Sequence, residues 1–131
     1  MTKEKIKEYS LKIADTLFEK KGRDIMVIDV EAVTPYFSYI IIATADSFLH
    51  LNALSKFVAD TLDELKIKKI NPSDSFTESP WILKDCGFLV IHILNEEART
   101  FYSLEKLWAD GQVIYDSTIS DKEIIGLNRS K

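Results

Sequence analysis

The sequence of 131 residues contains a single cysteine, Cys86, and no long apolar run. One cysteine excludes an intramolecular disulfide and a cysteine-based zinc cluster, and it suits the reducing cytoplasm. No stretch approaches the roughly 20 apolar residues that a membrane-spanning helix needs. Residues 1–17 carry charges throughout and lack the apolar core of a signal peptide. We therefore expect a soluble, cytoplasmic protein with no membrane association.

The sequence also lacks both common phosphate-binding loops, G-x-G-x-x-G and G-x-x-x-x-G-K followed by Ser or Thr. Its formal net charge is −4, with acidic and basic residues well mixed, which argues against broad binding to a phosphate backbone. We therefore expect neither a nucleotide cofactor nor direct DNA binding.

The whole sequence has the composition of one ordinary globular domain, because 46% of the residues are hydrophobic and 29% are charged. Apolar periodicity predicts an amphipathic helix over 3–21 and a second helix capped by Asp46 or Ser47. Nearly continuous apolar runs predict strands, which are 24–30, 39–45, 81–85 and 88–94. This order predicts a mixed sheet flanked by helices in a single α/β or α+β domain.

The C-terminal third contains two local signals. Residues 85–87 predict a tight turn between two strands, with Gly87 at positive φ. Asn95 is a predicted helix cap, and Ser103 starts either a second short helix or a bend in the same one. The stretch 112–131 is weakly patterned, so we expect a domain over 1–111 and a partly mobile tail over 112–131.

Candidate catalytic residues are few. Asp29 and Glu31 are expected on one strand face, where two carboxylates could bind Mg²⁺ for nucleotidyl transfer, but they also suit a solvated strand end. The loop that such a transferase needs has no counterpart before them, and the later "TADS" has Ala45 where glycine would be required. His92, on an apolar strand face, is more typical of a hydrogen-bonded core or interface residue than of a metal ligand. Cys86 is interpreted as an ordinary thiol in a turn. We expect no enzyme activity, no metal and no cofactor.

The segment "HILNEEARTFYSLEKLW" (92–108) is unusually rich in aromatic and charged residues. A continuous helix would place Phe101, Leu104 and Trp108 toward the core. Tyr102 and Leu107 would then lie outside, among charged neighbours, and Trp81 could reach the same surface. Exposed aromatics among charges are typical of a protein-binding patch, although packing of these side chains under the tail is a second interpretation.

The stretch "WILKDCGFLVIHILNEEARTFYSLEKLW" resembles the signature of the ribosomal silencing factor family, RsfS, also called Iojap-like. That signature has Trp, an Asp-x-Gly turn, a strand ending in His, and a segment from Glu-Glu through Tyr-x-Leu-Glu to Leu-Trp. The resemblance covers roughly residues 3 to 108. The partner-binding residues that it implies are Trp81, Asp85, His92, Arg99, Tyr102, Leu104, Glu105, Leu107 and Trp108.

This chain departs from the family pattern at three places. Phe37-Ser38 replaces the usual Thr-Asp, Ala45 replaces glycine, and Phe88 replaces the acid that commonly follows the turn glycine.

The resemblance implies a nucleotidyltransferase-like fold that has lost the transferase chemistry. It also implies a partner, ribosomal protein L-fourteen of the large ribosomal subunit, at the face where the small subunit docks. Such a factor blocks subunit joining and lowers translation when nutrients are scarce. The exposed aromatics would also permit a homodimer. The alternative function is a metal-dependent nucleotidyltransferase that uses Asp29 and Glu31.

Overall fold

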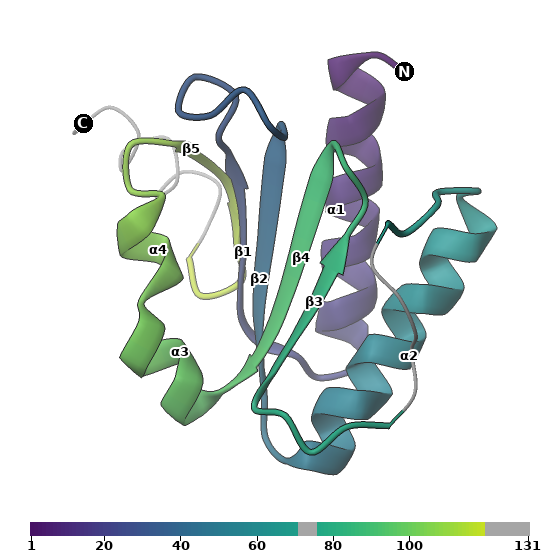
Figure 1. Ribbon diagram of the computed structural model, residues 1–131, viewed down its shortest axis with the longest axis vertical. Coiled ribbons are helices and arrows are strands. Elements are labelled where there is room, and N and C mark those ends of the chain that lie inside the picture. Colours follow the sequence, from purple (N-terminus) through teal and green to yellow (C-terminus); the bar gives the residue numbers. More distant parts are fainter. Residues whose placement is uncertain (71–75, 120–131) are drawn as a thin grey trace.

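A computed structural model describes residues 1–70 and 76–119, which form four helices and five strands (Figure 1). Residues 71–75 and the part of the expected tail from residue 120 onward lie outside the described residues. In chain order the elements are α1 (Lys3–Glu19), β1 (Arg23–Asp29), β2 (Tyr39–Ala45), α2 (Phe48–Glu64), β3 (Trp81–Asp85), β4 (Leu89–Asn95), α3 (Glu96–Tyr102), α4 (Leu104–Leu107) and β5 (Gln112–Asp116).

The five strands form one mixed sheet in the order β3-β4-β2-β1-β5. The central pair, β2 and β4, is parallel, and the other three pairs are antiparallel. β2 is buried along its whole length, which explains its unbroken apolar and β-branched sequence. The α/β class expected from the sequence is confirmed.

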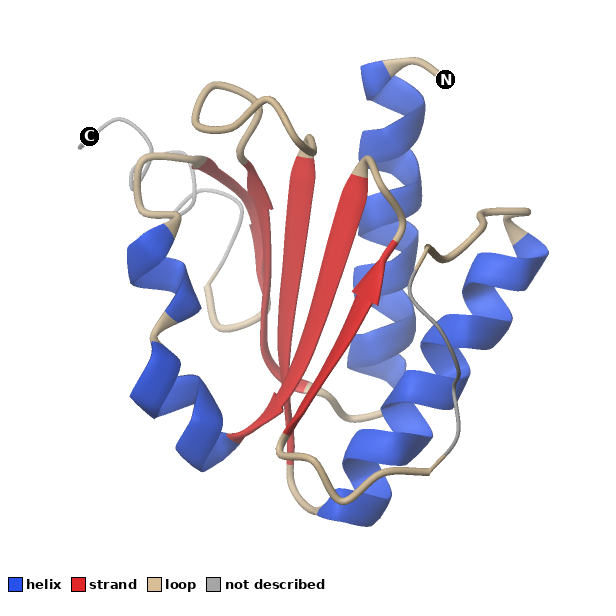
Figure 2. Cartoon of the chain, viewed as in Figure 1, coloured by secondary structure: helices blue, strands red, loops and turns tan. Residues whose placement is uncertain are grey.

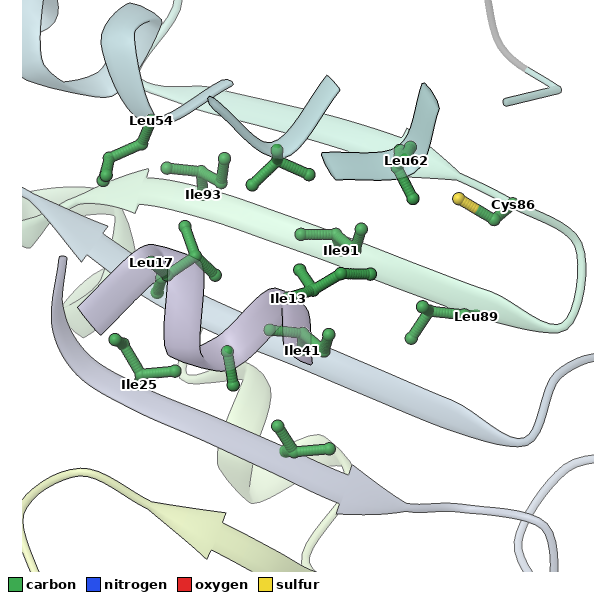
Figure 3. Packing of buried hydrophobic residues seen from close by; sticks show 14 of the residues in the cluster. Ile13, Leu17, Ile25, Ile41, Leu54, Leu62, Cys86, Leu89, Ile91 and Ile93 are labelled. Atoms are coloured by element: carbon green, nitrogen blue, oxygen red, sulfur yellow. The ribbon is translucent and has the colours of Figure 1, made fainter. Parts of the chain in front are cut away.

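Helices cover both faces of the sheet (Figure 2). α1 and α2 pack side by side on one face, and α3 and α4 lie on the other. The larger core lies under α1 and α2, where helix residues such as Ile13, Leu17 and Leu54 meet strand residues such as Ile41 and Ile91 (Figure 3). The smaller core lies under α3 and α4 and includes Ile40, Ile42, Leu94, Leu104 and Val113.

The local signals in the sequence have clear counterparts. Ser47 caps α2 by accepting a hydrogen bond from the His50 backbone N–H, and Asn95 caps α3 in the same way through Ala98. The turn between β3 and β4 contains Gly87 at φ 84°, and the Asp85 carboxylate accepts its backbone N–H at 2.8 Å. The predicted tight turn is confirmed.

The expected order of elements omitted one strand. Gln112–Asp116, assigned to a weakly patterned tail, forms β5 and pairs antiparallel with β1. Val113 is buried in the smaller core, and the Ser117 backbone N–H donates to the Ile25 carbonyl at 2.9 Å. Residues 112–117 therefore complete one edge of the sheet.

Candidate protein-binding surface

The helical segment after β4 breaks at Ser103. This residue has φ 47° and ψ 53°, a left-handed conformation that ends α3 and lets α4 start in a new direction. The sequence left open a second short helix or a bend in a single helix at Ser103, and the structure has two successive helices. A single helical wheel therefore does not describe residues 96–108.

The break corrects the expected core side of this segment. Ala98 and Leu104 are buried as predicted, and Trp108 is partly buried with its ring edge-on to Phe37 at 5.4 Å between centroids. Phe101, however, is 80% exposed, because it belongs to α3 and does not continue the apolar side of α4. The prediction that Phe101 faces the core is wrong.

Aromatic rings gather where α3 passes the start of β3, two of them exposed and the third, Trp81, partly buried. Tyr102 is 52% exposed, and its ring centroid lies 4.8 Å from that of Trp81 and 5.0 Å from that of Phe101. Leu83 is exposed and shares a strand face with Trp81, since side chains alternate along β3. We call Trp81, Leu83, Phe101 and Tyr102 the aromatic surface. Leu107, on α4, is also exposed.

His92 supports Trp81 from the neighbouring strand. Its Nδ1 accepts a hydrogen bond from the Trp81 indole N–H at 2.9 Å, and the two rings are tilted against each other. Burial lowers the pKa of His92 to about 4, so the ring is neutral at pH 7 and its Nδ1 can act as the acceptor. The expectation of a hydrogen-bonded histidine is confirmed.

Arg99 lies inside the molecule, although a continuous helix would place it outside. Its side chain is buried, donates to the Thr44 hydroxyl at 3.0 Å and pairs with Glu105 at 3.1 Å. The Arg99–Glu105 pair joins α3 to α4 across the break at Ser103. Arg99 and Leu104 therefore have almost no surface for a partner, and they hold the exposed residues in place.

Asp85 and Cys86, in the turn between β3 and β4, both make contacts within the protein. The Asp85 carboxylate fixes the Gly87 N–H, as described above. Cys86 is buried in the larger core, and burial raises the pKa of its thiol to about 11. The thiol is therefore protonated at neutral pH and is a poor nucleophile.

Asp29 and Glu31 both form ion pairs with a lysine of the same protein. β1 ends at Asp29, so Glu31 lies beyond the strand and not on its face as expected. Lys3 Nζ lies 2.9 Å from Asp29 Oδ2 and also pairs with Glu31. These hydrogen bonds raise the pKa of Lys3, which keeps its ammonium group charged between the two carboxylates. Within residues 1–70 and 76–119, no group of three or more His, Cys, Asp or Glu residues gathers in a way that could hold a metal ion.

The family model described as "Ribosomal silencing factor during starvation" matches residues 3–130. The chain belongs to the RsfS family. An RsfS from Bacillus subtilis is 33% identical over 94 residues, which cover 70% of this chain and 77% of that protein. The RsfS match reaches past residue 108, where the sequence resemblance was expected to end, and includes β5.

Two further relatives extend the comparison. The crystal structure of a Chromobacterium violaceum protein aligns with a TM-score of 0.74 at 32% identity, covering 79% of this chain and 86% of that one. A mouse protein named mitochondrial assembly of ribosomal large subunit protein 1 is 32% identical over 126 residues, which cover 88% of this chain and 54% of the mouse protein.

The RsfS signature includes some residues of the aromatic surface and omits others. Trp81 and Tyr102 were identified and are in ring contact. Phe101 and Leu83 were missed, although alternation along β3 places Leu83 beside Trp81.

No helix formed by the described residues is long and apolar enough to cross a bilayer.

Proposed function

We propose that this protein is a ribosomal silencing factor that acts in the cytoplasm. It binds the large ribosomal subunit through ribosomal protein L-fourteen, blocks joining of the small subunit and represses translation when nutrients are limited. It does so by steric exclusion, without catalysis, metal or nucleotide.

The aromatic surface is the observation that carries this proposal. The partly buried ring of Trp81 contacts the exposed ring of Tyr102, which contacts the exposed ring of Phe101. Large exposed aromatic side chains are the usual anchors of protein interfaces. Contiguous exposed apolar groups on a small domain are uncommon unless a partner covers them. Family membership supports the ribosome as that partner.

The aromatic surface is also held firmly before any partner arrives. The indole of Trp81 is fixed by His92, and α3 is tied to α4 by the Arg99–Glu105 pair. Such preorganisation lowers the entropy lost on binding, so a few rings can provide useful affinity. The same exposed rings permit a homodimer, which would compete with the subunit for this surface.

Light scattering during mixing of purified ribosomal subunits tests the function. Preincubation of the large subunit with the protein should lower the scattering increase that accompanies joining, with no added nucleotide. Preincubation with the small subunit should give no greater inhibition than adding the protein last. Unchanged joining at saturating protein would contradict the proposed function.

A matched pair of variants tests the surface. Tyr102→Ala should weaken cosedimentation with large subunits by about 2 kcal/mol, or roughly thirtyfold, because an interface aromatic is lost. Its thermal melt should change little, since half of the side chain is already exposed. Phe18→Ala removes an equally exposed ring from α1, on the opposite side of the sheet, and should bind like wild type. Equal binding by both variants would place the contact elsewhere.

A further inference from the structure

A groove lies at the edge of the sheet where β2 and β4 end. These neighbouring strands are parallel, and their last residues, Ala45 and Asn95, are paired. After β2 the chain enters α2 on one face of the sheet, and after β4 it enters α3 on the other face (Figure 1). Such a divergence opens a crevice beyond the carboxyl ends of the strands, where α/β proteins commonly bind their ligands.

This crevice has a volume of about 740 Å³, and we call it the switch-point groove. Two exposed rings line it, Phe48 from the first turn of α2 and Phe101 from α3. Phe101 also contacts Tyr102, so the switch-point groove adjoins the aromatic surface. Phe101 is 80% exposed and Phe48 46%, which suits a large partner that covers the rings better than a small molecule enclosed between them.

The groove is also acidic. Among the described residues, its lining carries three carboxylates, Asp46, Glu96 and Glu97, and one guanidinium, Arg23. Arg23 is shared, because it pairs with Asp46 and lies 3.6 Å from Glu96. Counting formal charges, three acids against one base leave −2 at this edge.

This charge selects the kind of occupant. RNA and phosphorylated ligands are repelled by the excess carboxylates, whereas the surface of a ribosomal subunit offers RNA and basic protein segments as its main contacts. A segment with Lys or Arg side chains can pair with Glu96 and Glu97 and place its aliphatic stems or an apolar neighbour against the two rings.

We propose that the switch-point groove receives a basic segment of a protein on the large ribosomal subunit, as a second contact beside the aromatic surface. This inference rests on the proposed function, and it adds a partner of defined chemistry that excludes ribosomal RNA from this groove.

Photocrosslinking tests the identity of the occupant. Phe48 is replaced by benzoylphenylalanine, and the protein is irradiated with purified large subunits after cosedimentation has shown that it is bound. We expect a crosslink to a protein segment containing Lys or Arg, identified by mass spectrometry, and the same replacement at Phe18 of α1 should give none. A crosslink to ribosomal RNA, or no crosslink from bound protein, would overturn the inference while leaving the proposed function intact. If the protein does not sediment with the subunits at all, both fail.

Charge variants give an independent measurement. The double variant Glu96→Gln/Glu97→Gln should associate with large subunits about tenfold more slowly at low salt, and the difference should shrink at high salt. The control Glu8→Gln/Glu64→Gln removes the same charge from exposed positions on α1 and at the end of α2. It should associate like wild type. Equal slowing by both double variants would show that the net charge of the protein causes the effect, and it would contradict a specific contact in the groove.

Discussion

Arg99 is the residue on which the local structure of the proposed interface depends most. Its guanidinium is buried between Thr44 on β2 and Glu105 on α4, so one side chain links the sheet to both short helices. A buried charge is tolerated only when it is paired and hydrogen-bonded, because its transfer from water is costly. Loss of either partner should therefore loosen the support of the aromatic surface.

We expect Glu105→Ala to lower the free energy of unfolding by about 1–3 kcal/mol, because Arg99 would lose its carboxylate while remaining buried. The matched control is Glu8→Ala, which breaks the exposed Lys5–Glu8 pair of α1 and should cost less than about 0.5 kcal/mol. Urea denaturation measures both. Similar small losses in the two variants would mean that the Arg99–Glu105 pair behaves as a surface pair.

His92 makes stability depend on pH. Its native pKa is about 4, below the ordinary value of 6.5, so between these two pH values the unfolded chain binds a proton at His92 and the folded protein does not. The contribution of neutral His92 to the free energy of unfolding is therefore complete above about pH 6.5 and is lost as the pH falls toward 4. His92→Asn keeps an acceptor for the Trp81 indole and does not titrate.

The stability of wild type relative to His92→Asn should therefore fall by about 2–3 kcal/mol between pH 7 and pH 4. Denaturation curves of the two proteins over this range measure the difference directly, and other titrating groups cancel between them. Parallel pH profiles would show that His92 is not protected from protonation in the folded state.

At the scale of elements, Ser103 sets the angle between α3 and α4. A residue with a Cβ is strained at its φ of 47°, whereas glycine is not. Ser103→Gly should therefore be more stable than Ser103→Ala by about 1 kcal/mol, and both lose the hydrogen bond from the Ser103 hydroxyl to the Thr100 carbonyl. Thermal melts compare the two variants. Equal melting temperatures would argue against a left-handed residue at this position.

The same break separates what could be predicted from the sequence from what could not. β2 and β3 were predicted with their observed bounds, because each is an apolar run flanked by strong turn signals. The side chains of α3 and α4 were misplaced because one left-handed residue changes the helical phase, and serine gives little warning of it. Burial of Arg99 could not be predicted, since its partner Thr44 is 55 positions away in the sequence.

β5 was missed for a related reason. Its short run of Val113, Ile114 and Tyr115 is a weak signal alone, and its place in the sheet depends on contacts with β1. Gly111 permits the chain to pass close to the end of β1, since a Cβ at this position would lie only 2.7 Å from the Asp29 carbonyl oxygen. Long-range pairing of this kind leaves no local periodicity from which it could be inferred.

At the scale of the whole molecule, two helix layers of unequal size enclose the sheet. α1 and α2 are 17 residues long each, whereas α3 and α4 have 7 and 4 residues. The short pair leaves the β3 side of its face less covered, which is where Trp81 and Leu83 lie. The fold thus combines one deeply buried face with one that leaves apolar side chains such as Leu83 and Tyr102 exposed.

The boundary of the folded unit follows from β5. We propose that residues 1–119 form it, because Val113 is buried in the smaller core and Ser117 exchanges two hydrogen bonds with the backbone of Ile25. A chain ending at residue 111 loses these contacts and exposes the ladder edge of β1, so it should be less stable than a chain ending at 119 by more than about 3 kcal/mol. Urea denaturation of the two chains gives the difference. If the chain ending at 111 unfolds with the same midpoint and slope, β5 contributes nothing to stability and the boundary lies at Gly111, as the sequence alone suggested.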